Sequence, residues 1–144
     1  MATRDLFHSI TELPSLLPQV HGGNTTLTGS AVDTFGYESV TLSVEVATRT
    51  DGTFTFKVQD CDTSGGSYAD IDPTCYMAGA APSGITAAGI TLFGLKDCSA
   101  ASPTTPGQLR RFLKVVETAT SVTTGATVRG SIILGHPHHR SAAV

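Results

Sequence analysis

The segment SVTLSVEVATRTDGTFTFKVQ, residues 39–59, consists of two runs of alternating apolar and polar residues around a Thr-Asp-Gly sequence. Alternation with a period of two is typical of a strand that is buried on one face. If Thr50, Asp51 and Gly52 form a three-residue loop, Val46 lies beside Phe56 on the neighbouring strand. The segment therefore predicts a β-hairpin with one covered face. Its apolar positions are Val40, Leu42, Val44, Val46, Phe54, Phe56 and Val58.

Strand-like segments of the same kind recur along the chain after residue 25, and none of that region has the pattern of a helix of ten residues. The sequence therefore predicts an all-β fold: a single β-sandwich or jelly-roll-like domain over 24–135, with seven or eight short strands. The expected strands are 26–32, 39–46, 53–59, 68–71, 90–95, 111–118 and 127–134.

The first 23 residues differ from the rest, because four apolar residues fall on one face of a helix while Pro14 and Pro18 interrupt that pattern. We expect a short helical turn or an extended arm over 1–23, which either patches the core of the domain or docks on a neighbour. Removal of residues 1–22 should then leave the domain folded. The apolar residues are Leu6, Ile10, Leu13 and Leu17.

The charge of the chain is divided unevenly. The net charge is −3, and only 15% of the 144 residues are charged. Residues 1–97 hold 11 acidic and 4 basic residues, whereas residues 98–144 hold 1 acidic and 5 basic residues. The basic residues are too dispersed, with too few aromatic residues between them, for a nucleic-acid groove, so an oppositely charged protein surface is the expected partner. They are Arg110, Arg111, Lys114, Arg129 and Arg140.

No run of about 20 apolar residues is available for a membrane helix, so no membrane partner is expected. Asp5, His8 and Glu12 stand where a signal peptide would keep an apolar run. We therefore expect synthesis in a cytoplasm without export.

The polar stretch DCDTSGGSYADIDP, residues 60–73, resembles the start of a calcium loop, with Asp60, Asp62 and Ser64 at its first three ligand positions. Ile71 stands where the bidentate glutamate would be needed, so a loop held by its own side chains is the favoured alternative. No metal and no cofactor are expected.

The other reactive side chains do not form a familiar catalytic pattern. His136, His138 and His139 lie in a C-terminal tail, 136–144, which we expect to be solvated or to contact a partner rather than to bind a metal. The sequence lacks the GxSxG and GxGxxG motifs, and no enzyme is predicted. Cys61 and Cys75 are either bridged across a folded loop or small buried groups.

Several stretches together resemble small proteins of tailed bacteriophages, the head decoration or cement proteins, whose genes usually lie beside that of the major capsid protein. The resemblance covers roughly residues 29–140 and rests on strand and turn signatures rather than on catalytic ones. These are residues 32–39 (VDTFGYES), 51–54 (DGTF), 59–60 (QD), 67–68 (SY), 111–116 (RFLKVV) and 134–137 (LGHP).

The resemblance implies a β-sandwich that binds the exterior of an assembled capsid in the virion and stabilises it. The expected partners are the major capsid protein and further copies of the chain, with a trimer favoured. Two alternatives stay open: a neck or tail-tube subunit, and a β-sandwich that binds a receptor or glycan. The residues expected to contact the capsid are Leu6, Ile10, Leu13, Leu17, Arg110, Arg129, His138 and Arg140.

Overall fold

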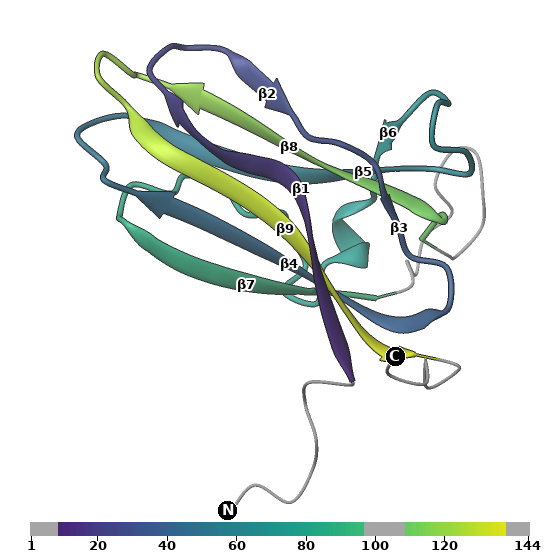
Figure 1. Cartoon of the computed structure of the whole chain (residues 1–144). Coiled ribbons are helices and arrows are strands. Elements are labelled where there is room, and N and C mark those ends of the chain that lie inside the picture. Colours follow the sequence, from purple (N-terminus) through teal and green to yellow (C-terminus); the bar gives the residue numbers. More distant parts are fainter. Residues whose placement is uncertain (1–8, 97–108, 138–144) are drawn as a thin grey trace, which may run out of the picture.

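A computed structural model describes residues 9–96 and 109–137 of the chain. Two antiparallel sheets pack face to face in these residues, and the predicted all-β sandwich is confirmed (Figure 1). No helix among the described residues is long and apolar enough to cross a membrane. The strands are β1 (Ile10–His21), β2 (Thr26–Thr28), β3 (Val32–Asp33), β4 (Tyr37–Ala47), β5 (Thr53–Cys61), β6 (Ala69–Asp70), β7 (Gly89–Leu95), β8 (Phe112–Thr120) and β9 (Ala126–Pro137), with a short 3₁₀ helix η1 at Pro73–Cys75.

The strand order is that of a jelly roll. One sheet, which we call sheet A, has the order β1-β9-β4-β7, and the other, sheet B, has the order β2-β8-β5-β6 with β3 also paired to β8. If β2 and β3 count as one interrupted strand, the chain crosses between the sheets at every connection except β5–β6. Two interlocked Greek keys of this kind define the jelly roll.

The predicted hairpin at residues 39–59 is wrong, because its two strands lie in different sheets. Strand β4 pairs with β9 and β7, whereas β5 pairs with β8 and β6. Val44 and Phe56 therefore belong to opposite layers of one core, where each is at most 1% exposed. Alternation shows that one face is buried, but it does not show which strand lies alongside.

The Thr-Asp-Gly sequence is instead a bridge between the sheets. The carboxylate of Asp51 accepts hydrogen bonds from the backbone N–H groups of Thr123, Thr124 and Gly125, at 2.7 to 3.2 Å, and so fixes the β8–β9 turn. Gly52 has a φ of +94°, and a Cβ there would lie 2.5 Å from a methyl carbon of Val122. Glycine is required at this position on both grounds.

The N-terminal segment also differs from expectation. Residues 10–21 form β1, which pairs with β9 along its length, so the predicted helical turn is wrong for these residues, and they belong to the domain rather than to a separate arm. Leu16 of this strand is 2% exposed within the sandwich. Removal of residues 1–22 would strip an edge strand and part of the core, so we no longer expect the remainder to stay folded.

Cys61 and Cys75 are not paired with each other. Cys75 forms a disulfide, whereas Cys61 is a free, buried thiol. A Cys61–Cys75 bridge is therefore excluded, and the partner of Cys75 lies outside the described residues.

Candidate interaction face

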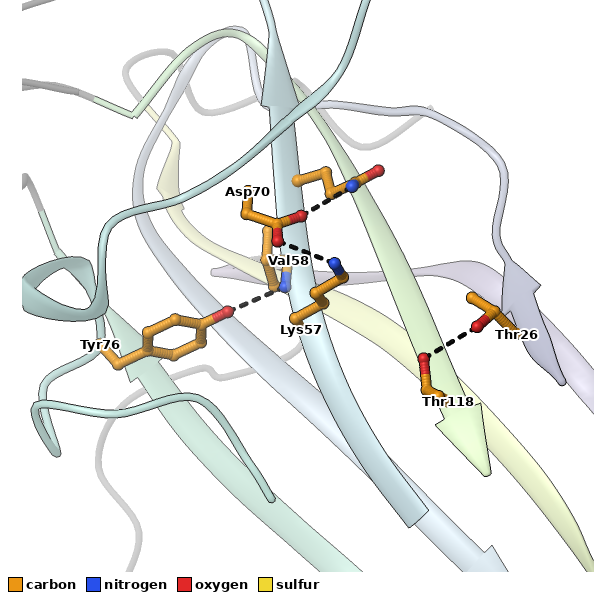
Figure 2. A network of polar contacts seen from close by, with 7 residues as sticks. Thr26, Lys57, Val58, Asp70, Tyr76 and Thr118 are labelled. Atoms are coloured by element: carbon orange, nitrogen blue, oxygen red, sulfur yellow. Dashed lines mark hydrogen bonds and ion pairs between the residues drawn. The ribbon is translucent and has the colours of Figure 1, made fainter. Parts of the chain in front are cut away.

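The outer face of sheet B is polar, and its side chains bond to one another (Figure 2). Lys57 and Gln59 each donate a hydrogen bond to Asp70 at 2.7 Å. The hydroxyls of Thr26 and Thr118 lie 3.0 Å apart across β2 and β8. A face of threonine, lysine and paired carboxylate is well solvated and offers little to an apolar partner.

Sheet A carries the exposed apolar side chains, and this contrast marks its outer face and edges as the candidate site. Among the described residues, eight large apolar side chains are exposed, and six of them belong to the two edge strands of sheet A. Exposed apolar groups gathered on one layer mark a contact surface more strongly than scattered ones. On β1 they are Ile10, Leu13, Leu17 and Val20, and on β7 they are Ile90 and Leu92.

A small charge network occupies the middle of this face. Arg129 of β9 forms an ion pair with Glu12 of β1, and its guanidinium lies 3.9 Å from the carboxylate of Glu45 on β4. The hydroxyl of Ser131 donates to the same oxygen of Glu12 at 2.5 Å. Two carboxylates around one guanidinium leave one negative charge, which favours a basic group on the surface that covers it.

A groove of about 330 Å³ lies between β1 and β9 beside this network. Two prolines and Leu17 form its apolar wall, and the charge network forms its other wall. The register of β1 shifts between Pro14 and Leu16 and again between Leu16 and Gln19, and these irregularities bend the strand next to the groove. Its lining residues are Glu12, Pro14, Leu17, Pro18, Arg129 and Ser131.

Of the five described residues that were predicted to contact a capsid, four lie on the neighbouring strands β1 and β9. Ile10, Leu13 and Leu17 are 40%, 36% and 63% exposed on β1. Arg129 lies on the same sheet, but Glu12 and Glu45 already neutralise it. Leu6, His138 and Arg140 lie outside the described residues.

Arg110 differs most from the predicted role in capsid contact, because its side chain is only 10% exposed. Its guanidinium lies 3.9 Å from both Asp60 and Asp62, and its backbone N–H donates to Asp60 at 3.1 Å. This arrangement disfavours the calcium hypothesis, because the positive charge of Arg110 lies beside the two carboxylates that would hold the cation. Ser64 instead supplies a backbone carbonyl to the hydroxyl of Tyr68. The loop is held by its own groups, and no metal-binding cluster is found among the described residues.

A second cluster joins the turn before β4 to the start of β8. Arg111 donates two hydrogen bonds to the carboxylate of Asp33 and lies 4.8 Å from the ring centroid of Phe35, which is 76% exposed. The Arg111 guanidinium lowers the pKa of Asp33 below its usual value. Asp33, Phe35 and Arg111 thus fix this turn.

The sandwich core contains an ionisable pair that sequence reasoning missed. Glu117 of β8 is fully buried, and one of its oxygens lies 2.5 Å from Nδ1 of His21 on β1. Nε2 of His21 lies 2.8 Å from the hydroxyl of Thr25. Burial raises the pKa of Glu117, and its other oxygen has no hydrogen-bond partner among the described residues.

The order hydroxyl, imidazole and carboxylate is the one that serine hydrolases use, but catalysis also needs a pocket and donors for an oxyanion. The described groove lies elsewhere, between β1 and β9, and does not include Thr25. The contact between Glu117 and His21 links β8 of sheet B to β1 of sheet A. In the sequence, the signal available for this pair was Glu117, a glutamate that directly follows the apolar residues Val115 and Val116.

Comparison with known proteins gives distant structural similarity only. No family model and no curated protein matches the chain. A structure of infectious bursal disease virus, Gx strain, matches with a TM-score of 0.45 and 15% identity over 91% of this chain, which spans about a third (35%) of that chain.

The capsid asymmetric unit of cyanophage Pam1 matches with a TM-score of 0.36 and 16% identity, over 95% of this chain and 92% of that one. The C-terminal family 22 carbohydrate-binding module of Clostridium thermocellum Xyn10B matches with a TM-score of 0.36 and 13% identity, over 94% and 88%. Similarity this distant includes viral capsid structures, but it does not discriminate between their role and sugar binding.

Proposed function

We propose that this chain is a structural component of a virion that binds the exterior of an assembled tailed-phage capsid and stabilises it. One observation carries the proposal: exposed apolar side chains gather on sheet A, while the outer face of sheet B is polar and internally bonded. The resemblance of residues 29–140 to head decoration proteins supports the same role. The jelly-roll topology agrees with it by analogy alone, because one fold serves many functions.

Binding through such a face would be enough for the protein to stabilise a shell without any catalytic step. A ligand that binds the assembled shell, but not loose subunits, shifts the equilibrium toward assembly by mass action. Each copy needs only modest affinity, since a closed shell presents the same site many times. The apolar side chains at the groove and on β7 would supply the desolvated contacts, and a basic group of the shell would meet Glu12 and Glu45.

The test uses heads of the virus that encodes this chain, purified without the chain. Added protein should co-sediment with these heads at a saturating copy number and should raise the temperature at which they release DNA. Leu17→Lys places a charge on the proposed face and should weaken binding about tenfold or more, as expected for one apolar hot spot.

Thr28→Lys is the matched control, because it adds the same charge at an exposed position of sheet B. It should bind as the unchanged protein does. Absence of co-sedimentation by the unchanged protein would reject the proposed function, and equal loss in both variants would reject the assignment to sheet A.

A further inference from the structure

Strand β7 is an edge of sheet A that lacks the usual protection against pairing with another strand. Natural edge strands carry charges, prolines or bulges that block such pairing. Strand β1, the opposite edge, has Pro14, Pro18 and two register shifts. Strand β7, with the sequence GITLFGL, has no charged residue and no proline, and residues 86–92 are all exposed.

The main chain of β7 is only partly paired on its free side. Gly94 accepts a hydrogen bond from the N–H of Met77, and Lys96 donates one to the carbonyl of Cys75, each at 2.9 Å. Because alternate residues of a strand point their N–H and C=O groups to the same side, those of Ile90 and Leu92 also point away from β4. In residues 9–96 and 109–137, no strand other than β4 pairs with this part of β7.

The second side of β5 is a comparable strand edge, but the chain covers it. The second side of β5 is covered by the loop that follows β6: Phe54 exchanges hydrogen bonds with Ile85 at 2.9 and 3.0 Å, and the N–H of Phe56 donates to the carbonyl of Pro82 at 2.8 Å. The N–H of Val58 donates to the buried hydroxyl of Tyr76 at 2.8 Å (Figure 2). The free side of β7 at Ile90 and Leu92 therefore differs from the second side of β5, which the chain covers with its own hydrogen bonds.

We propose that β7 pairs with β7 of a second copy of this chain, antiparallel and about a two-fold axis at Thr91. In this register Ile90 lies opposite Leu92 of the second copy, and Leu92 lies opposite its Ile90. Both are hydrogen-bonded pairs, and each exchanges two main-chain bonds. The apolar side chains, which are 66% and 60% exposed in the single chain, then pack against each other on the outer face.

A second copy fits this edge because the edge is complementary to itself. The paired segment carries no charge, so two copies meet without repulsion, and the shared surface is the same patch on both, as a two-fold interface requires. The pairing ends after Phe93, where the chain around Met77 already occupies the free side, and Gly89, with a φ of +152°, lets the strand turn away.

The pairing surface is small. A standard stable interface has about 20–30 residues on each side, and β7 with Met77 offers far fewer. The association is therefore weak and depends on concentration, and copies held side by side on a surface pair more readily than free ones. This two-fold pair differs from the trimer that the resemblance implies, and it does not depend on capsid binding.

Sedimentation of the full chain from about 10 µM to about 1 mM covers the range in which so small an interface forms and dissociates. The unchanged protein should shift reversibly from monomer to dimer. Leu92→Pro removes an N–H that points away from β4 and keeps the β4–β7 hydrogen bonds, and Leu92→Lys adds a protecting charge. Both variants should stay monomeric, while Leu17→Lys, the same change on the opposite edge, should dimerise as the unchanged protein does.

Amide hydrogen exchange identifies the strand involved. The N–H groups of Ile90 and Leu92 should exchange quickly at low concentration and more slowly at high concentration. A monomer throughout the range overturns the proposal, and so does a Leu92→Lys variant that dimerises normally. Slow exchange of these amides at every concentration would show that the chain covers β7 itself, which also overturns it.

Discussion

Replacement of His21 by leucine should expose the energetic role of the buried pair between the two sheets. The imidazole of His21 is the partner of Glu117, whose other oxygen has no hydrogen-bond partner among the described residues. Leucine keeps much of the side-chain volume, so the variant tests the loss of the pair rather than the creation of a cavity. Glu117 would then be a carboxyl group in an apolar core without a partner.

The expected loss follows from the burial of both groups, since His21 is 4% exposed and Glu117 is fully buried. Removal of one partner from a buried ion pair typically costs about 3–5 kcal/mol. For a chain of this length, that corresponds to a fall of about 10–17 °C in Tm. The ring of Phe54 lies 6.5 Å from that of His21 between centroids, and a phenyl ring cannot replace the imidazole as a donor.

The loss should depend on pH in a defined direction. Burial raises the pKa of Glu117, and His21 opposes this rise, so the variant should have a still higher pKa at Glu117. A folded state that holds a proton more tightly than the unfolded state loses stability as the pH rises through the folded pKa. The variant should therefore be weakest at pH 7 and should recover part of its stability at pH 5.

Urea unfolding followed by far-UV circular dichroism measures this, because the chain has no tryptophan. Thr25→Val is the control, since it removes only the exposed partner of His21 and should cost less than about 1 kcal/mol. The double variant His21→Leu/Glu117→Leu should lose less stability than His21→Leu alone. A loss below about 1 kcal/mol at pH 7 in His21→Leu, or an equal loss at pH 5, would refute the reasoning.

Three further variants test the packing and the polar contacts of the sandwich. Gly130→Ala should lower the free energy of unfolding by about 1–3 kcal/mol, because the added Cβ would lie 2.6 Å from a methyl carbon of Val115; thermal unfolding measures the loss. Tyr76→Phe should cost about 1–3 kcal/mol in urea unfolding, because it leaves the buried N–H of Val58 without its acceptor. Asp51 has a pKa lowered by hydrogen bonds from the backbone N–H groups of the β8–β9 turn, so its contribution is present above its unfolded pKa of 3.8 and is lost as the pH falls below that value. In a pH series of unfolding curves, Asp51→Asn should reduce the fall in unfolding free energy at acid pH. An unchanged fall would contradict this role of Asp51.

Most strands could be predicted from the sequence because their alternation is local. The expected segments 53–59 and 90–95 lie within β5 and β7, and 127–134 lies within β9. The pairing of strands could not be predicted in this way, since Val44 and Phe56 have the same pattern whether their strands lie side by side or in opposite layers. Long-range pairing, such as β4 with β9, leaves no signal in the spacing of residues 39–59.

Strand β1 was missed for a different reason. An edge strand tolerates proline, and Pro14 and Pro18 lie in one here. The register shifts near Leu16 break the period of two, and the remaining spacing of Ile10, Leu13 and Leu17 imitates a helix. The candidate face could not be predicted from the sequence either, because it depends on which strands occupy the edges of sheet A.

A cryo-electron microscopy reconstruction of the head of the virus that encodes this chain tests the central proposal most directly. The proposal predicts density for the sandwich on the outer surface of the shell, with β1, β9, β4 and β7 against the capsid subunits and the polar face of sheet B toward solvent. A head without this sandwich on its exterior, or one in which sheet B forms the contact, would contradict it.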